Sequence, residues 1–173
     1  RATVGFLKED TLDATNASIG QTAHIYIDGV GASGNTSEEL ESMFLREEIK
    51  DKAITDPHFQ AQVASLLTEK GLVIAFSLSG KTKDTFDSIT IAKSNGAKVI
   101  AVTNYIHSPI GRSADFVLQT AIDEFLNGGS LAGKVSQLYI CDLRVQGYEK
   151  KNNINAIELR EKVLRSILDK SID

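Results

Sequence analysis

The chain has 173 residues, of which 42% are hydrophobic and 24% are charged, a balance typical of one folded domain with its own core. The net charge of −4 argues against a chain that binds a nucleic acid by itself. A single cysteine, Cys141, excludes a disulfide framework and a cysteine metal cluster, and no apolar run approaches the ~20 residues of a membrane span. The start of the chain has no signal-peptide core. We therefore expect no metal, no cofactor and no membrane partner, and a cytoplasmic setting.

Short apolar runs, rich in β-branched residues, alternate with helical patterns along the chain. A weak helical pattern at residues 6–23 leads to an apolar run at 24–30 and a helix after it. A short strand at 49–54 and a helix that begins near Asp56 come next. Further apolar runs at 71–80, 97–104 and 115–120 are each followed by a helical pattern. Apolar strands that alternate with helices predict a parallel sheet covered on both faces.

The last helical pattern, at residues 152–170, has apolar residues on one face of the helix. That stripe consists of Ala156, Leu159, Val163 and Ile167. Because a lone domain would expose part of the stripe, we expect the chain to form a homodimer or a higher homo-oligomer. The alternative is that the stripe packs on the chain's own sheet.

Two of the predicted loops follow the carboxyl ends of strands, where open parallel sheets bind their ligands. The first, GVGASGN at 29–35, has the G-x-G-x-x-G spacing of a dinucleotide site. Such a site also needs an acidic residue at the end of the second strand, and neither Asp51 nor Asp56 clearly ends one. The alternative is a tight turn whose glycines let backbone N–H groups and Ser33 face a ligand at a helix N-terminus.

The second loop, in AFSLSGKTKD at 75–84, has more hydroxyl groups than a plain turn needs. The hydroxyls of Ser77, Ser79 and Thr82 and the nearby N–H groups can converge on one anion, and the dipole of the following helix favours negative charge there. A phosphate monoester offers matching acceptor oxygens. No lysine stands where a Walker loop has one, which argues against a nucleoside triphosphate. The alternative is a helix cap with turn serines.

Taken in order, the segments GVGASG, DPHFQ, VIAFSLSGKTKDT and AKVIAVTNYIHSPIGRSADFVL resemble the sugar isomerase (SIS) domain, in particular its version in RpiR-type transcription regulators. The resemblance covers about residues 24–146. It implies a three-layer α/β/α sandwich with a five-stranded parallel sheet, which the alternation of strands and helices also suggests. It divides the chain into an N-terminal helix or linker (1–23), a SIS domain (24–150) and a C-terminal amphipathic helix (151–173).

The resemblance also implies the residues that bind a phosphosugar. Ser77, Ser79 and Thr82 would hold the phosphate, and Ser33 would lie close to the sugar. The aspartate-x-histidine segment of RpiR-type regulators corresponds here to Asp56–His58, so His58 is a candidate sugar contact in its own or a neighbouring subunit. The alternative for a lone histidine near a helix start is a cap or surface residue.

SIS isomerases need a general base, usually a glutamate early in the helix after the last strand. The resemblance places Lys134 there, a cation that can pair with a phosphate or a sugar oxygen. Glu124, just upstream, is the remaining candidate base, and otherwise a solvated loop acid. Because this set of acid and base residues is incomplete, the sequence favours a sensor that binds a sugar phosphate without converting it. Among sugar phosphates, we lean to an amino or N-acetyl hexose 6-phosphate. DNA would be bound only through a helix-turn-helix domain N-terminal to Arg1, and the alternative is a phosphosugar isomerase.

Overall fold

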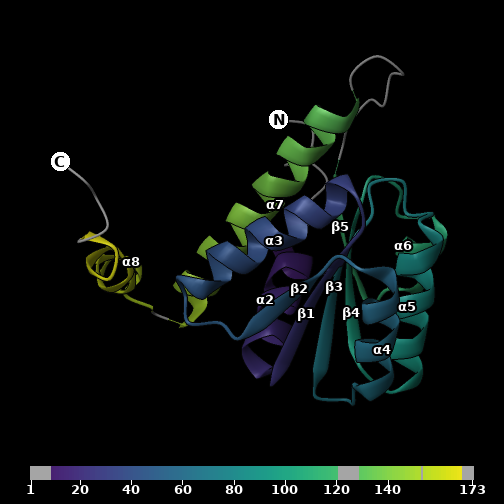
Figure 1. The fold of residues 1–173 in the computed structure, drawn as a ribbon, viewed down its shortest axis with the longest axis horizontal. Coiled ribbons are helices and arrows are strands. Elements are labelled where there is room, and N and C mark those ends of the chain that lie inside the picture. Colours follow the sequence, from purple (N-terminus) through teal and green to yellow (C-terminus); the bar gives the residue numbers. More distant parts are fainter. Residues whose placement is uncertain (1–8, 121–128, 153, 169–173) are drawn as a thin grey trace.

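A computed structural model describes residues 9–120, 129–152 and 154–168 of the chain. One five-stranded parallel sheet forms its centre, with the strands in the order β2-β1-β3-β4-β5 (Figure 1). The strands are β1 (His24–Gly29), β2 (Asp51–Ile54), β3 (Gly71–Phe76), β4 (Lys98–Thr103) and β5 (Phe116–Gln119). This confirms the predicted five-stranded parallel sheet.

Helices cover both faces of the sheet and make the three predicted layers (Figure 1). One face carries α2 (Glu9–Gln21), α3 (Ala32–Leu45) and α7 (Gly129–Asn152). The other carries α4 (Pro57–Leu66), α5 (Lys83–Ser94) and α6 (Pro109–Ser113). The last helix, α8 (Ala156–Arg165), projects from this body.

The central strand β3 explains why its sequence is almost continuously apolar. All of its residues are buried, because helices cover it from both sides. Leu72, Ile74 and Phe76 enter the core under α2, α3 and α7, whereas Val73 and Ala75 enter the core under α4, α5 and α6. Because successive side chains of a strand point to opposite faces of the sheet, β3 contributes apolar side chains to both cores.

Local signals mark several helices correctly. Asp56 caps α4 by accepting a hydrogen bond from the Phe59 N–H at 2.8 Å, and Pro57 occupies the first turn, so the helix begins where the sequence predicts it. At the N-terminal side, α2 packs on α7, and the absence of a side chain at Gly147 lets the two helices approach closely around Asn16. Cys141, on α7, is buried. Among the helices described, none is long and apolar enough to cross a bilayer.

Candidate functional site

The candidate site lies beyond the carboxyl ends of β1 and β3. These strands are neighbours in the sheet, and the chain order changes direction between them, because β2 flanks β1 on one side and β3 flanks it on the other. Such a switch point is where open α/β sheets bind ligands. Gly29 pairs in register with Phe76, so the loops that follow the two strands begin at the same level.

The loop after β3, residues 77–82, is here called the serine loop. Its Ser77 and Thr82 hydroxyl oxygens lie 3.0 Å apart and share a hydrogen bond. Ser79 Oγ accepts a hydrogen bond from the Lys81 N–H at 3.2 Å. Thr82 occupies the N-cap position of α5, but its side chain does not cap the helix. The first-turn N–H groups of α5 and the positive end of its dipole are therefore available to an anion beside the hydroxyls.

The end of β4 and the start of α6 hold the serine loop in place. The Leu78 carbonyl oxygen accepts hydrogen bonds from the Asn104 N–H at 2.9 Å and from Thr103 Oγ1 at 3.2 Å. The Gly80 carbonyl oxygen accepts one from the Ile110 N–H at 3.1 Å. These supporting residues were not predicted from the sequence. The signal available for them was a polar pair, Thr103 and Asn104, directly after an apolar strand.

The glycines of the first loop are explained by close packing. A Cβ at Gly29 would lie 2.5 Å from the Ser33 carbonyl oxygen and from Ser37 Oγ. Gly31 is the N-cap residue of α3 and has a φ of 60°, a conformation that favours glycine. The second strand ends at Ile54, so the acidic residue of a dinucleotide site is missing there. The structure therefore favours the tight-turn interpretation, with Ser33 half-buried in the first turn of α3.

Two buried polar contacts tie the first loop to the elements around it. Ser88 Oγ on α5 donates a hydrogen bond to Asp28 Oδ2 at 2.7 Å, so the end of β1 is linked to the helix that follows the serine loop. Burial raises the pKa of Asp28 from its ordinary value of 3.8 to about 6, and the Ser88 hydrogen bond opposes this shift. Gln60 Nε2 donates to the carbonyl oxygens of Gly29 at 3.2 Å and Ile54 at 2.6 Å. These hydrogen bonds hold the end of β1 in place against α5, α4 and the end of β2.

Lys134 lies on α7, which packs on α3, the helix that follows the first loop. Thr36 on α3 contacts Gln137 on α7 through a hydrogen bond of 3.3 Å between Oγ1 and Oε1. Ser33 and Lys134 each precede this pair by one helical turn. Because both helices follow parallel strands and run in the same direction, Ser33 and Lys134 lie at corresponding positions of adjacent helices.

The remaining predicted site residues are less closely associated with the serine loop. His58 is exposed in the first turn of α4, at the same edge of the sheet but after β2, the strand beyond β1. Glu124 lies outside the described residues. The structure thus brings Ser77, Ser79 and Thr82 into one loop and places Ser33 on the loop next to it.

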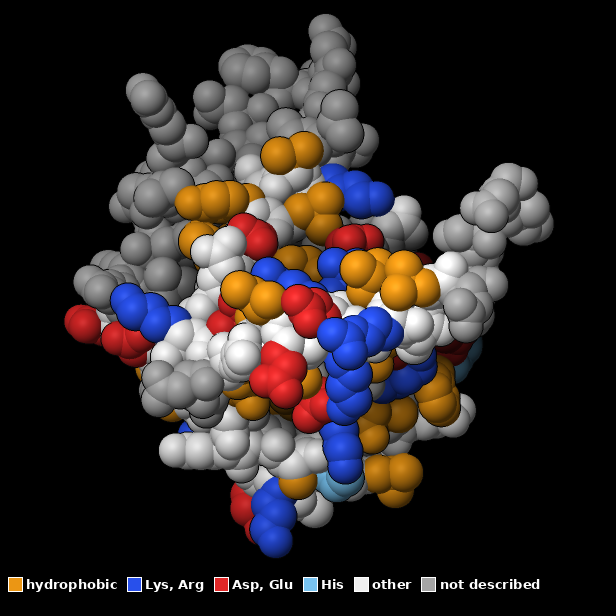
Figure 2. Space-filling view, turned by 90° about the vertical axis from the view of Figure 1, so that its left-hand side faces the viewer, with side chains coloured by type: hydrophobic (Ala, Val, Ile, Leu, Met, Phe, Trp, Pro, Cys, Tyr) orange, Lys and Arg blue, Asp and Glu red, His pale blue; other side chains and the backbone are white. Residues whose placement is uncertain are grey.

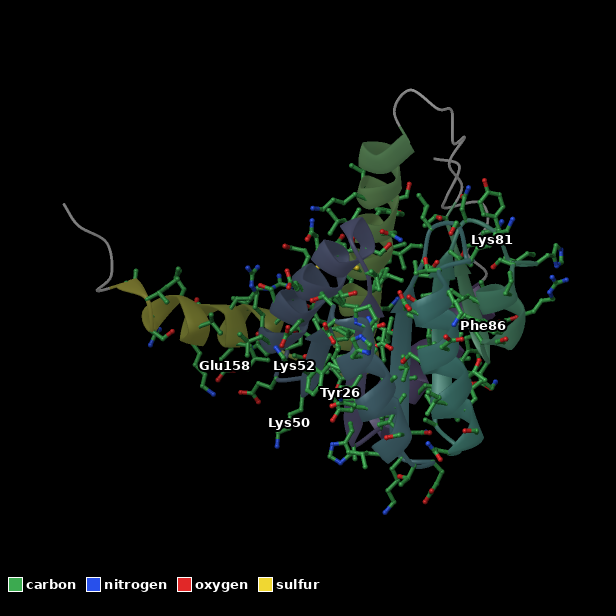
Figure 3. The ribbon with its side chains drawn as sticks, turned by 45° about the vertical axis from the view of Figure 1, so that its right-hand side comes forward. Tyr26, Lys50, Lys52, Lys81, Phe86 and Glu158 are labelled. Carbon is green, nitrogen blue, oxygen red and sulfur yellow. The ribbon has the colours of Figure 1, made fainter. Side chains whose placement is uncertain are left out.

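The chemistry of this edge suits an oxyanion. The serine loop supplies hydroxyl and N–H donors, and the exposed Lys81 adds a cation (Figure 3). In the part of the chain that the structure describes, no group of three or more His, Cys, Asp or Glu side chains could hold a metal ion. A groove of about 770 Å³ lies elsewhere, along the edge strand β2, and Tyr26, Lys50 and Lys52 among its lining residues are well separated from Lys81 (Figure 3). That groove lacks the serine loop's convergent donors, so we place the site at the strand ends.

Known proteins share both the sequence and the fold of this chain. The family model of the SIS domain matches residues 18–145. An HTH-type transcriptional regulator of Haemophilus influenzae is 33% identical over 98% of the chain, which spans 59% of that relative. The regulator RpiR of Escherichia coli is 34% identical over 66% of the chain, and the matched part is 39% of its length.

Among solved structures, the Vibrio vulnificus NanR protein complexed with ManNAc-6P superposes with a TM-score of 0.91 at 25% identity, covering 99% of this chain and 65% of that one. The fold, the order of the motifs and the serine loop at the switch point all agree with the family match. Since the family model covers most of its length, this chain belongs to the SIS domain family.

Proposed function

We propose that this chain is the phosphosugar-binding effector domain of an RpiR-type transcriptional regulator. The observation that carries the proposal is the serine loop, which has three hydroxyl side chains, two of them joined by a hydrogen bond, and leads directly into α5, whose N-terminus has no side-chain cap. The regulators that match this chain support the class of protein. Because the chain spans about half the length of such relatives, DNA binding is assigned to a helix-turn-helix domain outside it. We further propose that the regulator acts in the cytoplasm as a homodimer or higher homo-oligomer.

Within this proposal, each residue has a distinct role. Ser77, Ser79 and Thr82 donate hydrogen bonds to the phosphate oxygens, together with the first-turn N–H groups of α5. Ser33 and Lys134 lie at corresponding positions on α3 and α7, and bind sugar oxygens. His58, from the start of α4, contacts the far side of the sugar. Glu124 completes the predicted set, and its role rests on the sequence alone.

The proposed ligand is an amino or N-acetyl hexose 6-phosphate. The serine loop recognises only the phosphate, so the choice of sugar depends on Ser33, Lys134 and His58, which offer a hydroxyl, a cation and an imidazole. The NanR protein, which matches over nearly the full length of the chain, was solved with ManNAc-6P, an N-acetylated hexosamine 6-phosphate. This supports the lean to an amino sugar.

Titration calorimetry with a panel of hexose and N-acetylhexosamine 6-phosphates tests the proposal. Ser79→Ala should weaken binding by about 1.5–3 kcal/mol, or roughly 10- to 150-fold, because it removes a hydrogen bond to a charged group. Ser94→Ala is the matched control, since Ser94 is exposed in the last turn of α5, at the end of the helix away from the serine loop, and donates a hydrogen bond to the Ile91 carbonyl oxygen. Equal affinities of the two variants would remove Ser79 from the site.

We also propose that the chain binds its sugar phosphate without converting it. Isomerisation requires a base beside the carbon that loses its proton, and the helix position where SIS isomerases carry glutamate holds Lys134 instead. The test is to incubate the protein with its tightest ligand in heavy water and to follow the sugar by NMR. Deuterium at the carbon next to the carbonyl, lost in Glu124→Gln, would identify the chain as an isomerase.

A further inference from the structure

The C-terminal helix α8 stands apart from the rest of the fold. No residue of α8, all of which the structure describes, is buried. Ionic contacts connect it to the body. Lys162 Nζ lies 3.0 Å from Glu48 Oε1, and the Arg160 guanidinium pairs with the Glu149 carboxylate and lies 3.6 Å from that of Glu47. Figure 2, which views the molecule from the side on which α8 lies, shows hydrophobic side chains at the surface among acidic and basic ones.

Apolar residues lie on two different sides of α8. Leu159 and Val163 are half-buried and line a small groove of about 240 Å³ together with Leu45 at the end of α3. These two belong to the stripe from which the sequence predicted self-association, so their side is turned toward the chain's own body. A second set, here called the outer stripe, is exposed on α8 and in the turn after it: Ile157 at 71%, Leu164 at 54% and Leu168 at 56%; in that turn Ile167, the last residue of the first stripe, is also 48% exposed.

The outer stripe has the spacing of a helix-packing surface. Its residues occupy positions i, i+7 and i+11, and Glu161 fills the position at i+4, which is the pattern of a seam between two helices. The hydrogen bonds from Ser166 N to Val163 O and from Ile167 N to Leu164 O continue the turn toward Leu168. A ten-residue helix is marginal in water without packing, and several large apolar side chains exposed on one helix and the turn after it are a recognised sign of an interface.

The charges beside the outer stripe favour a second copy of α8 in the antiparallel direction as the packing partner. Glu158 and Glu161 lie in the first half of α8, and Arg165 lies in its last turn, whereas Arg160 and Lys162 are paired with carboxylates of the body. A second α8 that runs antiparallel brings the acidic half of each helix beside the basic end of the other. A parallel pair would place like charges together.

We infer that α8 of one copy packs antiparallel on α8 of a second copy, around a two-fold axis near the middle of the helix. Ile157 of one copy then meets Leu168 of the other, and Leu164 lies close to the axis. Arg165 of each copy comes within a turn of the other's Glu161, with which it already pairs in its own helix at 3.4 Å. This contact is isologous and closes on itself, so it gives a dimer and not a filament.

Sedimentation equilibrium at tens of micromolar tests the surface. The unmodified chain is expected to sediment as a dimer, and Leu164→Glu should raise the dimer dissociation constant at least tenfold, because it places two carboxylates near the axis. Leu66→Glu is the control, since Leu66 is 82% exposed on α4, outside the proposed contact. Circular dichroism checks that both variants fold. A monomeric parent chain, or equal effects of the two substitutions, would overturn the inference.

Disulfide cross-linking tests the direction of packing. The native Cys141 is fully buried, and burial raises its pKa to about 12, so it does not compete with introduced cysteines. An antiparallel pair places position 157 beside position 168 of the other copy. Under mild oxidation, a mixture of Ile157→Cys and Leu168→Cys chains should cross-link at least tenfold faster than either variant alone. Faster cross-linking of each variant with itself would show a parallel or unrelated contact and overturn the antiparallel arrangement.

Discussion

Gly80 is the residue on which the shape of the serine loop most directly depends. Its φ is +65°, a region that an L-residue occupies at a cost of about 1–2 kcal/mol. A Cβ built there would lie 1.9 Å from Ser108 Oγ and 2.5 Å from Ser108 Cβ, and 2.9 Å from Thr103 Oγ1. Since Ser108 is itself buried and caps α6 through the Gly111 N–H, the loop must shift instead. That shift endangers the hydrogen bond between Gly80 O and Ile110 N, worth about 1 kcal/mol.

Gly80→Ala should therefore lower the free energy of unfolding by about 3 kcal/mol, which for a chain of this size lowers Tm by about 6–12 °C. Gly96→Ala is a matched control, because Gly96 also has a positive φ, +88°, but an added Cβ would come no closer than 3.5 Å to another atom. That variant should lose only about 1–2 kcal/mol. Thermal unfolding measures both, and calorimetry should show sugar phosphate binding weakened at least tenfold in Gly80→Ala. Equal melting temperatures of the two variants would refute the clash.

Two further predictions concern the buried polar braces beneath the loops. Because the pKa of Asp28 is raised to about 6, folding binds a proton between about pH 4 and 6, and the stability that this carboxyl group contributes falls as the pH rises through that window. Asp28→Asn should therefore be more stable than the parent chain at pH 8, by up to about 3 kcal/mol, with the difference vanishing near pH 4. Urea unfolding across this range checks it, and a difference independent of pH would contradict it. Gln60→Leu, of similar size, leaves the Gly29 and Ile54 carbonyl oxygens without their donor and should cost about 2 kcal/mol. Gln62→Leu, on an exposed face of the same helix, is its control in the same assay, and equal losses would argue against the brace.

Much of the fold could be predicted because its signals are local. The runs around Ile25 and Val73 are apolar and β-branched, and each is followed by glycine or serine and then by a helical period. The cap at Asp56 needs only the next three residues. Ser77 and Thr82 are five residues apart, so a tight loop brings their hydroxyls together whatever the rest of the chain does. These parts of the candidate site could therefore be predicted from the sequence.

The supports of the site could not be predicted in the same way, because they come from distant parts of the chain. Ser88 meets Asp28 across 60 positions, and Gln137 meets Thr36 across 101. Nothing near Asp28 in the sequence indicates a buried donor. For α8, the helical period of the sequence predicted an apolar face. It did not show which face of the helix would pack on the rest of the chain. The stripe that includes Leu159 was expected to be partly exposed, with packing on the chain's own sheet as the alternative, and the structure places Leu159 in a groove beside Leu45 at the end of α3.

The pair Asp28–Ser88 shows how a binding site can impose a polar contact on an apolar core. The layer between the sheet and α5 contains small side chains, which let the helix lie close to the sheet but interlock weakly; they are Ala75, Ala92 and Ala101. An apolar residue in place of Asp28 would avoid the cost of burying a carboxyl group. An apolar contact is not directional, however, so it would allow α5 to take several positions along β1. The 2.7 Å hydrogen bond between Ser88 and Asp28 can form in only one of these positions of α5. In the proposed site, α5 presents its N-terminus to the ligand and β1 leads into the loop of Ser33, so fixing that register fixes the distance between the two halves of the proposed site.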